Sequence, residues 1–170
     1  MNPGDSALLP ISNVPSYLDV VLKALALHTE ARTSFITLRI LSFLPSSISF
    51  SWGRGGVERK KTDRDLLLDR YWLPYMLKHE YIALRFVAQD AYEQAAPMRI
   101  APTPDVVTRV FMLFRGVAVG DLALWESASA RAAGVGASGA LWADVVGVDV
   151  ARAADTGLFR VLEWGGMEVQ

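Results

Sequence analysis

One stretch limits the possible folds more than any other: residues Val106–Val117, with the sequence VVTRVFMLFRGV. β-Branched and aromatic residues crowd this run, and the only polar side chains in it are those of Thr108, Arg109 and Arg115. Such a composition favours a strand that is buried inside a β-sheet. Pro102–Asp105 (PTPD) supplies a turn before the strand, because proline fixes φ and aspartate can hydrogen-bond to nearby backbone. The sequence therefore predicts a sheet with this strand at its centre.

The other patterns predict an α+β domain around that strand. A helix is expected over Tyr17–Ser34, where leucines and valines recur at helical spacing and Asp19 lies in the first turn. Further strands are expected at Tyr81–Val87 and Leu158–Val169, the second with a bulge or hairpin bend at Gly165–Gly166. We therefore predict a single domain in which an N-terminal helix packs on a mainly antiparallel β-sheet.

The segments between these elements have weaker patterns. Asp121–Ala133 contains good helix formers and begins with an acidic residue, so a helix is expected there. Ala91–Ala96 is expected to form one or two helical turns. Leu141–Val150 is apolar with a glycine inside it, which fits either a strand or an irregular core segment.

Two segments are expected to lie outside the regular fold. Residues 1–15 contain three prolines, a glycine and several serine and asparagine residues, which is typical of a flexible leader, so the domain is expected to span residues 16–170. Residues 38–70 pass from an apolar, serine-rich run through GRGG to a block of alternating charges. Because these parts favour different structures, we expect a poorly ordered insert. It is either a genuine element or the translation of a retained intron.

Composition argues against several classes of function. The formal net charge of the 170 residues is −1, whereas proteins that bind nucleic acid or a membrane surface carry an excess of basic residues. No nucleic acid or membrane partner is therefore expected. The absence of cysteine excludes disulfides, thiolate metal sites and thiol catalysis. The N-terminal residues lack the pattern of a secretory signal and no apolar run has the length of a membrane span, so a soluble cytoplasmic protein is expected.

The two histidines offer little metal chemistry. His28 and His79 lie far apart in the sequence, and neither has a second ligand at metal-binding spacing, so no metal site is expected. His28 is expected at the surface of its helix. His79 can serve as a general base, because an imidazole titrates near neutral pH. The chain contains neither a phosphate-binding glycine loop nor a serine nucleophile elbow, and no cofactor is expected.

Charged side chains inside the apolar strands are better candidates for a site. They are Arg85, Arg109, Arg115 and Glu163. Because side chains alternate between the faces of a strand, Arg109 and Arg115 point to the same face if no bulge lies between them. Arginines on such a face can bind a carboxylate or phosphate through paired hydrogen bonds. The alternative is that they face solvent or pair with Glu163.

Five blocks of sequence occur in a distinctive order: HTEARTSFIT, YWLP, YIALRF, PTPDVVTRVFMLFRGV and RVLEWGGMEV. Together they resemble an uncharacterised family of small fungal proteins that has more distant bacterial relatives. In those proteins SFIT runs directly into YWLP, whereas here residues 38–70 separate Thr37 from Tyr71. The family has no established activity, cofactor or catalytic residue, so the resemblance implies none for this chain.

Two functions remain open at this point. The first is a soluble intracellular binding or interaction domain, whose arginine-bearing sheet face takes an unknown protein or a small anionic ligand. The alternative is a small enzyme that uses His79 or Glu163 as acid or base while Arg109 orients an anionic substrate. The enzyme needs one of these groups beside an enclosed pocket, whereas the binding domain needs only an open face.

Overall fold

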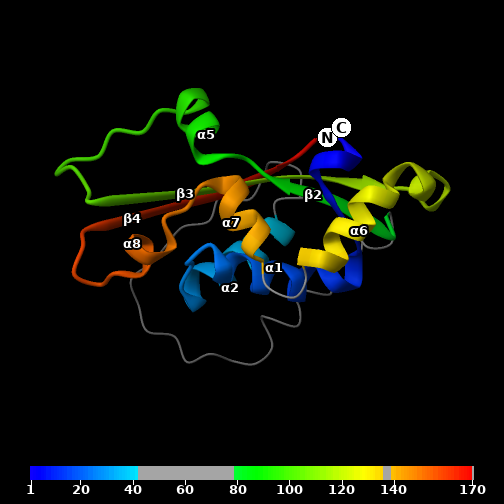
Figure 1. The fold of residues 1–170 in the computed structure, drawn as a ribbon, viewed down its shortest axis with the longest axis horizontal. Helices are drawn as coiled ribbons and strands as arrows, with labels where there is room; N and C mark the ends of the chain where they lie inside the picture. Colours follow the sequence, from blue (N-terminus) through cyan, green and yellow to red (C-terminus); the bar gives the residue numbers. More distant parts are fainter. Residues whose placement is uncertain (42–78, 136–138, 170) are drawn as a thin grey trace.

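The structure, a computed structural model, describes residues 1–41, 79–135 and 139–169 of the chain. Its elements are η1 (Pro3–Asp5), β1 (Ala7–Pro10), η2 (Ile11–Asn13), α1 (Val14–Ala24), α2 (Thr29–Leu41), β2 (Tyr81–Phe86), α5 (Gln89–Ala95), β3 (Val106–Val117), η4 (Val119–Trp125), α6 (Glu126–Val135), α7 (Ala140–Val146), α8 (Val150–Ala154) and β4 (Arg160–Glu168), where η denotes a 3-10 helix. The expected α+β domain is confirmed, because these helices accompany a four-stranded, mostly antiparallel sheet (Figure 1).

The strands lie in the sheet in the order β1-β2-β3-β4. β1 pairs with β2, and β2 with β3, in antiparallel fashion, whereas β4 runs parallel to β3. β3 therefore has a partner on each side, and its predicted central position is confirmed. β4 keeps a one-to-one register with β3 through Gly165 and Gly166, so the expected bulge or hairpin bend is wrong. Glycine permits such a bend without requiring it, and the long partner strand continues the ladder past the pair.

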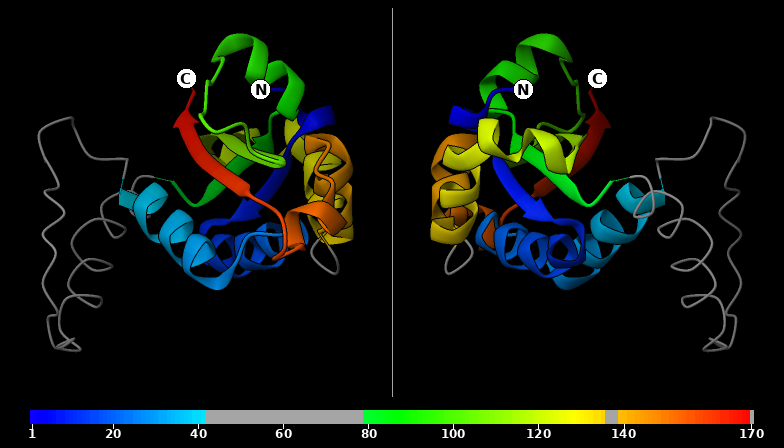
Figure 2. Two further views of the ribbon diagram at one scale, coloured as in Figure 1. Left: turned by 90° about the vertical axis from the view of Figure 1, so that its left-hand side faces the viewer. Right: turned by 90° about the vertical axis from the view of Figure 1, so that its right-hand side faces the viewer.

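The main core lies between one face of the sheet and helices α1, α2 and α7. Figure 2 shows α1 and α2 beneath the sheet and α5 on the opposite side. Alternate residues of β3, namely Val110, Met112 and Phe114, face this core and are at most 3% exposed. Trp142 of α7 belongs to the same core, where its ring packs against that of Phe86, and its indole N–H donates to the hydroxyl of Tyr17 in α1 at 2.8 Å. This bond satisfies a polar group that is otherwise buried among apolar side chains.

Residues 1–15 belong to the fold, so the expected flexible leader is wrong. The first three residues of β1 are at most 7% exposed, and the strand pairs with β2 at the edge of the sheet. Proline does not disrupt this segment, because each proline lies at an element boundary. Pro3 and Pro15 lie in the first turns of η1 and α1, and Pro10 ends β1.

The single helix expected over Tyr17–Ser34 is in fact two helices. α1 ends in a Schellman motif, in which the amide of Ala26 donates to the carbonyl of Lys23 and that of Leu27 to the carbonyl of Leu22. Ala26 itself has a φ of 62°, in the left-handed region. Glycine normally occupies that position, so the alanine conceals the helix end in the sequence.

The apolar segment Leu141–Val150, expected as a strand or irregular core, contains helix α7 instead. Gly139 and Gly147 cap its two ends with φ values of 66° and 79°. The glycine inside the apolar run is therefore a helix C-cap. The helix expected over Asp121–Ala133 is divided between η4 and α6.

The insert expected at residues 38–70 is covered only at its start. Helix α2 continues to Leu41, and residues 42–70 lie outside the described residues. Within the described ranges, no helix is both long enough and apolar enough to cross a membrane.

Candidate functional site

The outer face of the sheet, opposite the core, carries the charged strand residues. In the register of the sheet, Arg109 lies opposite Glu163, Arg85 opposite Leu113, and Arg115 opposite Ala83. These positions alternate with the core positions of β3, so the three arginines and Glu163 share one face. β3 has no bulge between Arg109 and Arg115, so the two side chains lie on the same face of the sheet, as predicted.

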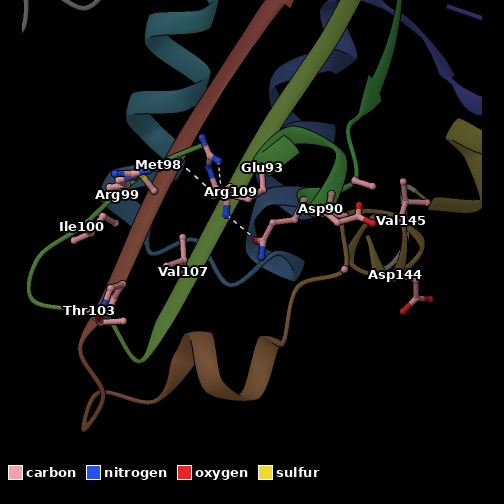
Figure 3. Close-up of a pocket in the computed structure, with 15 residues that line it drawn as sticks. Asp90, Glu93, Met98, Arg99, Ile100, Thr103, Val107, Arg109, Asp144 and Val145 are labelled. Atoms are coloured by element: carbon pink, nitrogen blue, oxygen red, sulfur yellow. Dashed lines mark hydrogen bonds and ion pairs between the residues drawn. The ribbon is translucent and has the colours of Figure 1, made fainter. Parts of the chain in front are cut away.

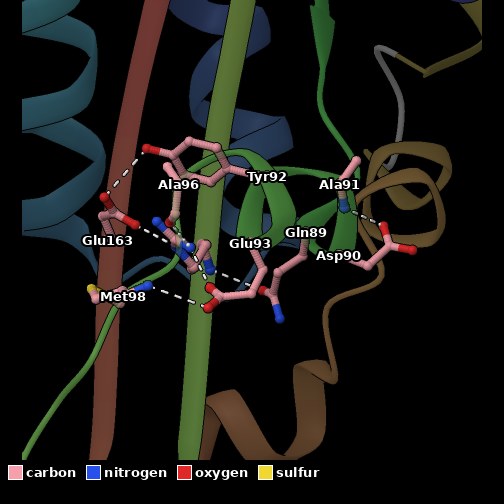
Figure 4. Close-up of polar contacts among 9 residues, drawn as sticks. Gln89, Asp90, Ala91, Tyr92, Glu93, Ala96, Met98 and Glu163 are labelled. Carbon is pink, nitrogen blue, oxygen red and sulfur yellow. Dashed lines mark hydrogen bonds and ion pairs between the residues drawn. The ribbon is translucent and has the colours of Figure 1, made fainter.

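Helix α5 covers one end of this face and brings a second carboxylate to Arg109 (Figure 4). Arg109 Nη1 donates to the carboxylate of Glu93 and, at 2.7 Å, to the backbone carbonyl of Ala96, while Nε donates to Glu163 Oε2. The ring centre of Tyr92 lies 4.3 Å from the guanidinium, and its hydroxyl donates to the other oxygen of Glu163 at 3.3 Å. One cation is thus held between two anions and an aromatic ring. We call this set of residues the Arg109 network.

The charge of Arg109 is fully engaged inside the protein. Its side chain is only 3% exposed, whereas those of Glu93 and Glu163 are 48% and 35% exposed. The hydrogen bond to Glu163 raises the pKa of Arg109 above its usual value, against the opposing effect of burial. Burial, together with the charge of Glu163, likewise raises the pKa of Tyr92. Arg109 therefore stays charged, and its single positive charge is already paired with two carboxylates.

The other two arginines lie apart from the Arg109 network. Arg85 forms an ion pair with Asp5 of η1. Burial alone would raise the pKa of Asp5, but hydrogen bonds from Ser6 and from the amide of Asn2, with the charge of Arg85, lower it overall. Arg115 is half-buried, and its side chain makes no hydrogen bond or ion pair with another described residue. Among the three predicted arginines, Arg115 is thus the one whose charge has no partner within the described part of the chain.

The histidines lie away from the arginine face. The ring of His79 occupies the space that a Cβ at Gly116 would need, and Gly116 falls on the core face of β3. His79 and Glu163 are therefore on opposite faces of the sheet. His28 lies just before α2, where its Nδ1 accepts the amide of Ala31 at 3.3 Å and caps the helix. The described residues contain no group of acidic or histidine side chains arranged to hold a metal ion.

A groove of about 870 Å³ lies beside the Arg109 network (Figure 3). Its walls come from α5, the segment that follows α5, the first half of β3 and the C-terminal end of α7. The apolar part of the lining is made by Met98, Ile100, Pro104, Val107 and Val145. We call this the α5–α7 groove.

Charged side chains line the edges of the α5–α7 groove. The acidic residues are Asp90, Glu93 and Asp144, and the basic residues are Arg99 and Arg109. Glu93 and Arg109 neutralise each other within the Arg109 network, which leaves two aspartates and one arginine. In Figure 3, Arg99 lies on the β4 side of β3, whereas Asp90 and Asp144 lie on the α7 side. The α7 side of the groove is therefore acidic.

A second groove, of about 570 Å³, lies between β1, α1 and α6. None of the described residues in its lining is charged, and Tyr17, whose pKa is raised by burial, forms part of its wall. His79 and Glu163 line neither of these two grooves.

Two members of the Arg109 network were missed from the sequence. Glu93 and Tyr92 lie in α5, where only helical turns were expected. Spacing along the chain does not show that this short helix folds back over the sheet. The signal that was available is the arginine itself, because a charge inside an apolar strand needs a partner of opposite charge.

Comparison of the chain with family models, with curated proteins and with solved structures gives no match in any of the three. The resemblance to the small fungal proteins therefore stays an expectation from the sequence, and the function has to follow from the site itself.

Proposed function

We propose that this protein is a non-catalytic binding domain whose ligand occupies the α5–α7 groove. The observation that carries the proposal is the combination of an apolar floor with uncompensated charges at the edge of one groove. A volume of about 870 Å³ falls within the range of roughly 300–1,000 Å³ that is usual for small-ligand sites. Val107 lies in the part of β3 that pairs with β4, opposite Val161, so the floor is part of the sheet.

The Arg109 network supports this groove rather than serving as the binding site. Helix α5 forms one wall, although none of its residues is fully buried. It is held by the contacts of Glu93 and Tyr92 with Arg109, and by Gln89, which accepts the backbone amide of Arg109 at 2.9 Å. An anionic ligand at Arg109 would have to displace a carboxylate that is already bound. The binding role expected for the arginine face therefore moves to the adjacent groove.

The enzymatic alternative has no comparable support. A general acid or base must come within hydrogen-bond reach of its substrate. Glu163 is engaged by Arg109 and Tyr92, and His79 lies on the other face of the sheet. Since neither lines the α5–α7 groove or the groove between β1, α1 and α6, binding is the single function that we propose.

The proposal can be tested by filling the groove. Val107→Trp places a large ring over the apolar floor, and Val150→Trp makes the same change at an exposed position on α8 that does not line the groove. We expect a library of small aromatic and aliphatic fragments to include some that raise the melting temperature, because ligands of the folded state stabilise it by mass action. Val107→Trp should abolish that rise and Val150→Trp should preserve it. Fragments that stabilise all three proteins equally, or none, would contradict the proposal.

A further inference from the structure

We infer that the α5–α7 groove selects an organic cation, in which an apolar body carries a protonated amine or guanidinium that lies against the α7 side. This inference rests on the proposed binding function and adds the charge and shape of the ligand. It reverses the sign expected from the sequence, where the strand arginines indicated an anion.

Two carboxylates give the α7 side its charge, and they come from different elements. Asp90 lies in the first turn of α5, and Asp144 lies in α7. Asp90 Oδ1 accepts the amide of Ala91 at 2.7 Å, and neither aspartate forms an ion pair with a described residue. Both line the groove and both are exposed, so a ligand can reach them.

Neither arginine among the described lining residues pairs with these aspartates. Arg109 is nearly buried and is held by two carboxylates and the carbonyl of Ala96. Arg99 lies across β3 from Asp90 and Asp144 (Figure 3). A positive group on the α7 side therefore lies nearer to the aspartates than to Arg99, whereas a carboxylate there is repelled.

The apolar lining selects the rest of the ligand. Val145 is 38% exposed next to Asp144, and Val107 and Ile100 continue the apolar surface away from the aspartates. An aromatic ring or short alkyl chain on this surface would displace water from beside the charge and strengthen its attraction to the carboxylates. The described residues contain no group of acidic or histidine side chains arranged to hold a metal ion, and the apolar lining suits an organic body, so the cation that fits is organic.

The test uses three probes of the same shape on the full chain: phenethylammonium, phenethyl alcohol and 3-phenylpropionate. Titrations followed by NMR should show the ammonium probe binding about tenfold more tightly than the alcohol, and the carboxylate most weakly. Added salt should reduce the preference for the ammonium probe, because the aspartates are exposed.

Matched variants locate the charge effect. Asp90→Asn and Asp144→Asn should each weaken binding of the ammonium probe and leave the alcohol unchanged, which also shows that the groove is intact. Asp121→Asn, an exposed aspartate on η4 outside the groove, should change neither. If the alcohol and the ammonium probe bind the unmutated protein equally at low salt, the inference is wrong and the proposed function stands. If no probe binds, both are wrong.

Discussion

At the scale of single residues, Arg109 determines how α5 meets the sheet. Its guanidinium joins Glu93 of α5 to Glu163 of β4, and the Tyr92 ring covers its face. Removing one partner from a buried ionic group costs more than replacing the whole group, because it leaves charge without compensation. Loss of Arg109 should therefore destabilise the protein through repulsion between Glu93 and Glu163, the two carboxylates that it separates.

We expect Arg109→Leu to lower the free energy of unfolding by about 2–4 kcal/mol, somewhat less than for a fully buried ion pair, because both glutamates are partly exposed. Adding Glu93→Gln and Glu163→Gln to that variant should recover part of the loss. Urea unfolding of the three proteins measures both effects. If the triple variant is no more stable than the single one, uncompensated charge is not the cause.

The position of Arg109 could be predicted from the sequence, but its environment could not. A charge inside an apolar strand is visible in the residue pattern, and Glu163 was one of its predicted alternatives for pairing. The alternation rule gives a face without saying what covers that face. Because α5 folds back over the strand, a residue that could equally have faced solvent is 3% exposed.

At the scale of elements, local patterns predicted the strands better than the helix ends. β3 was predicted with its observed bounds, because a twelve-residue run rich in apolar and aromatic side chains identifies a buried strand without reference to any partner. The parallel direction of β4 was not predicted, since it depends on the long connection through η4, α6, α7 and α8. The end of α1 was missed because Ala26 occupies a position where glycine is the usual signal.

Ala26 offers a direct test of that helix end. We expect Ala26→Gly to stabilise the protein by about 0.5–1 kcal/mol, because it removes the strain of a left-handed alanine, partly offset by the greater freedom of glycine in the unfolded chain. Ala130→Gly, at an exposed position within α6, should instead destabilise the protein by roughly 0.5–1 kcal/mol. Thermal unfolding distinguishes the two. A lower melting temperature for Ala26→Gly would mean that the Schellman motif does not set the end of α1.

At the scale of the whole molecule, the main question is whether the long segment between α2 and β2 is a genuine element or the translation of a retained intron. Joining Thr37 directly to Tyr71 restores the continuous SFIT-YWLP phrase of the proteins that the chain resembles. We expect this deletion to give a more soluble protein with a higher melting temperature. It removes the apolar run SFLPSSISF, and a shorter connection between α2 and β2 reduces the entropy that is lost when the chain ends are brought together.

Calorimetry and the solubility of the purified proteins measure the effect of this deletion. A shorter control that removes only GRGG, Gly53–Gly56, should leave both properties close to those of the unmodified protein. If the full deletion unfolds the protein, residues 38–70 are a genuine element of the fold.

The order of pairing in the sheet has a consequence for the chain during its synthesis. The ion pair that fixes η1 to β2 joins residues 80 positions apart, and the Arg109–Glu163 pair between β3 and β4 spans 54. Helices α1 and α2 can pack as soon as they leave the ribosome, whereas the sheet waits for distant partners, a topology associated with slow folding. Until Arg160–Glu168 emerges, one edge of the twelve-residue strand β3 has no partner. In that interval the apolar strand is open to pairing with another nascent chain, so the molecule is most prone to aggregate between the emergence of β3 and that of β4.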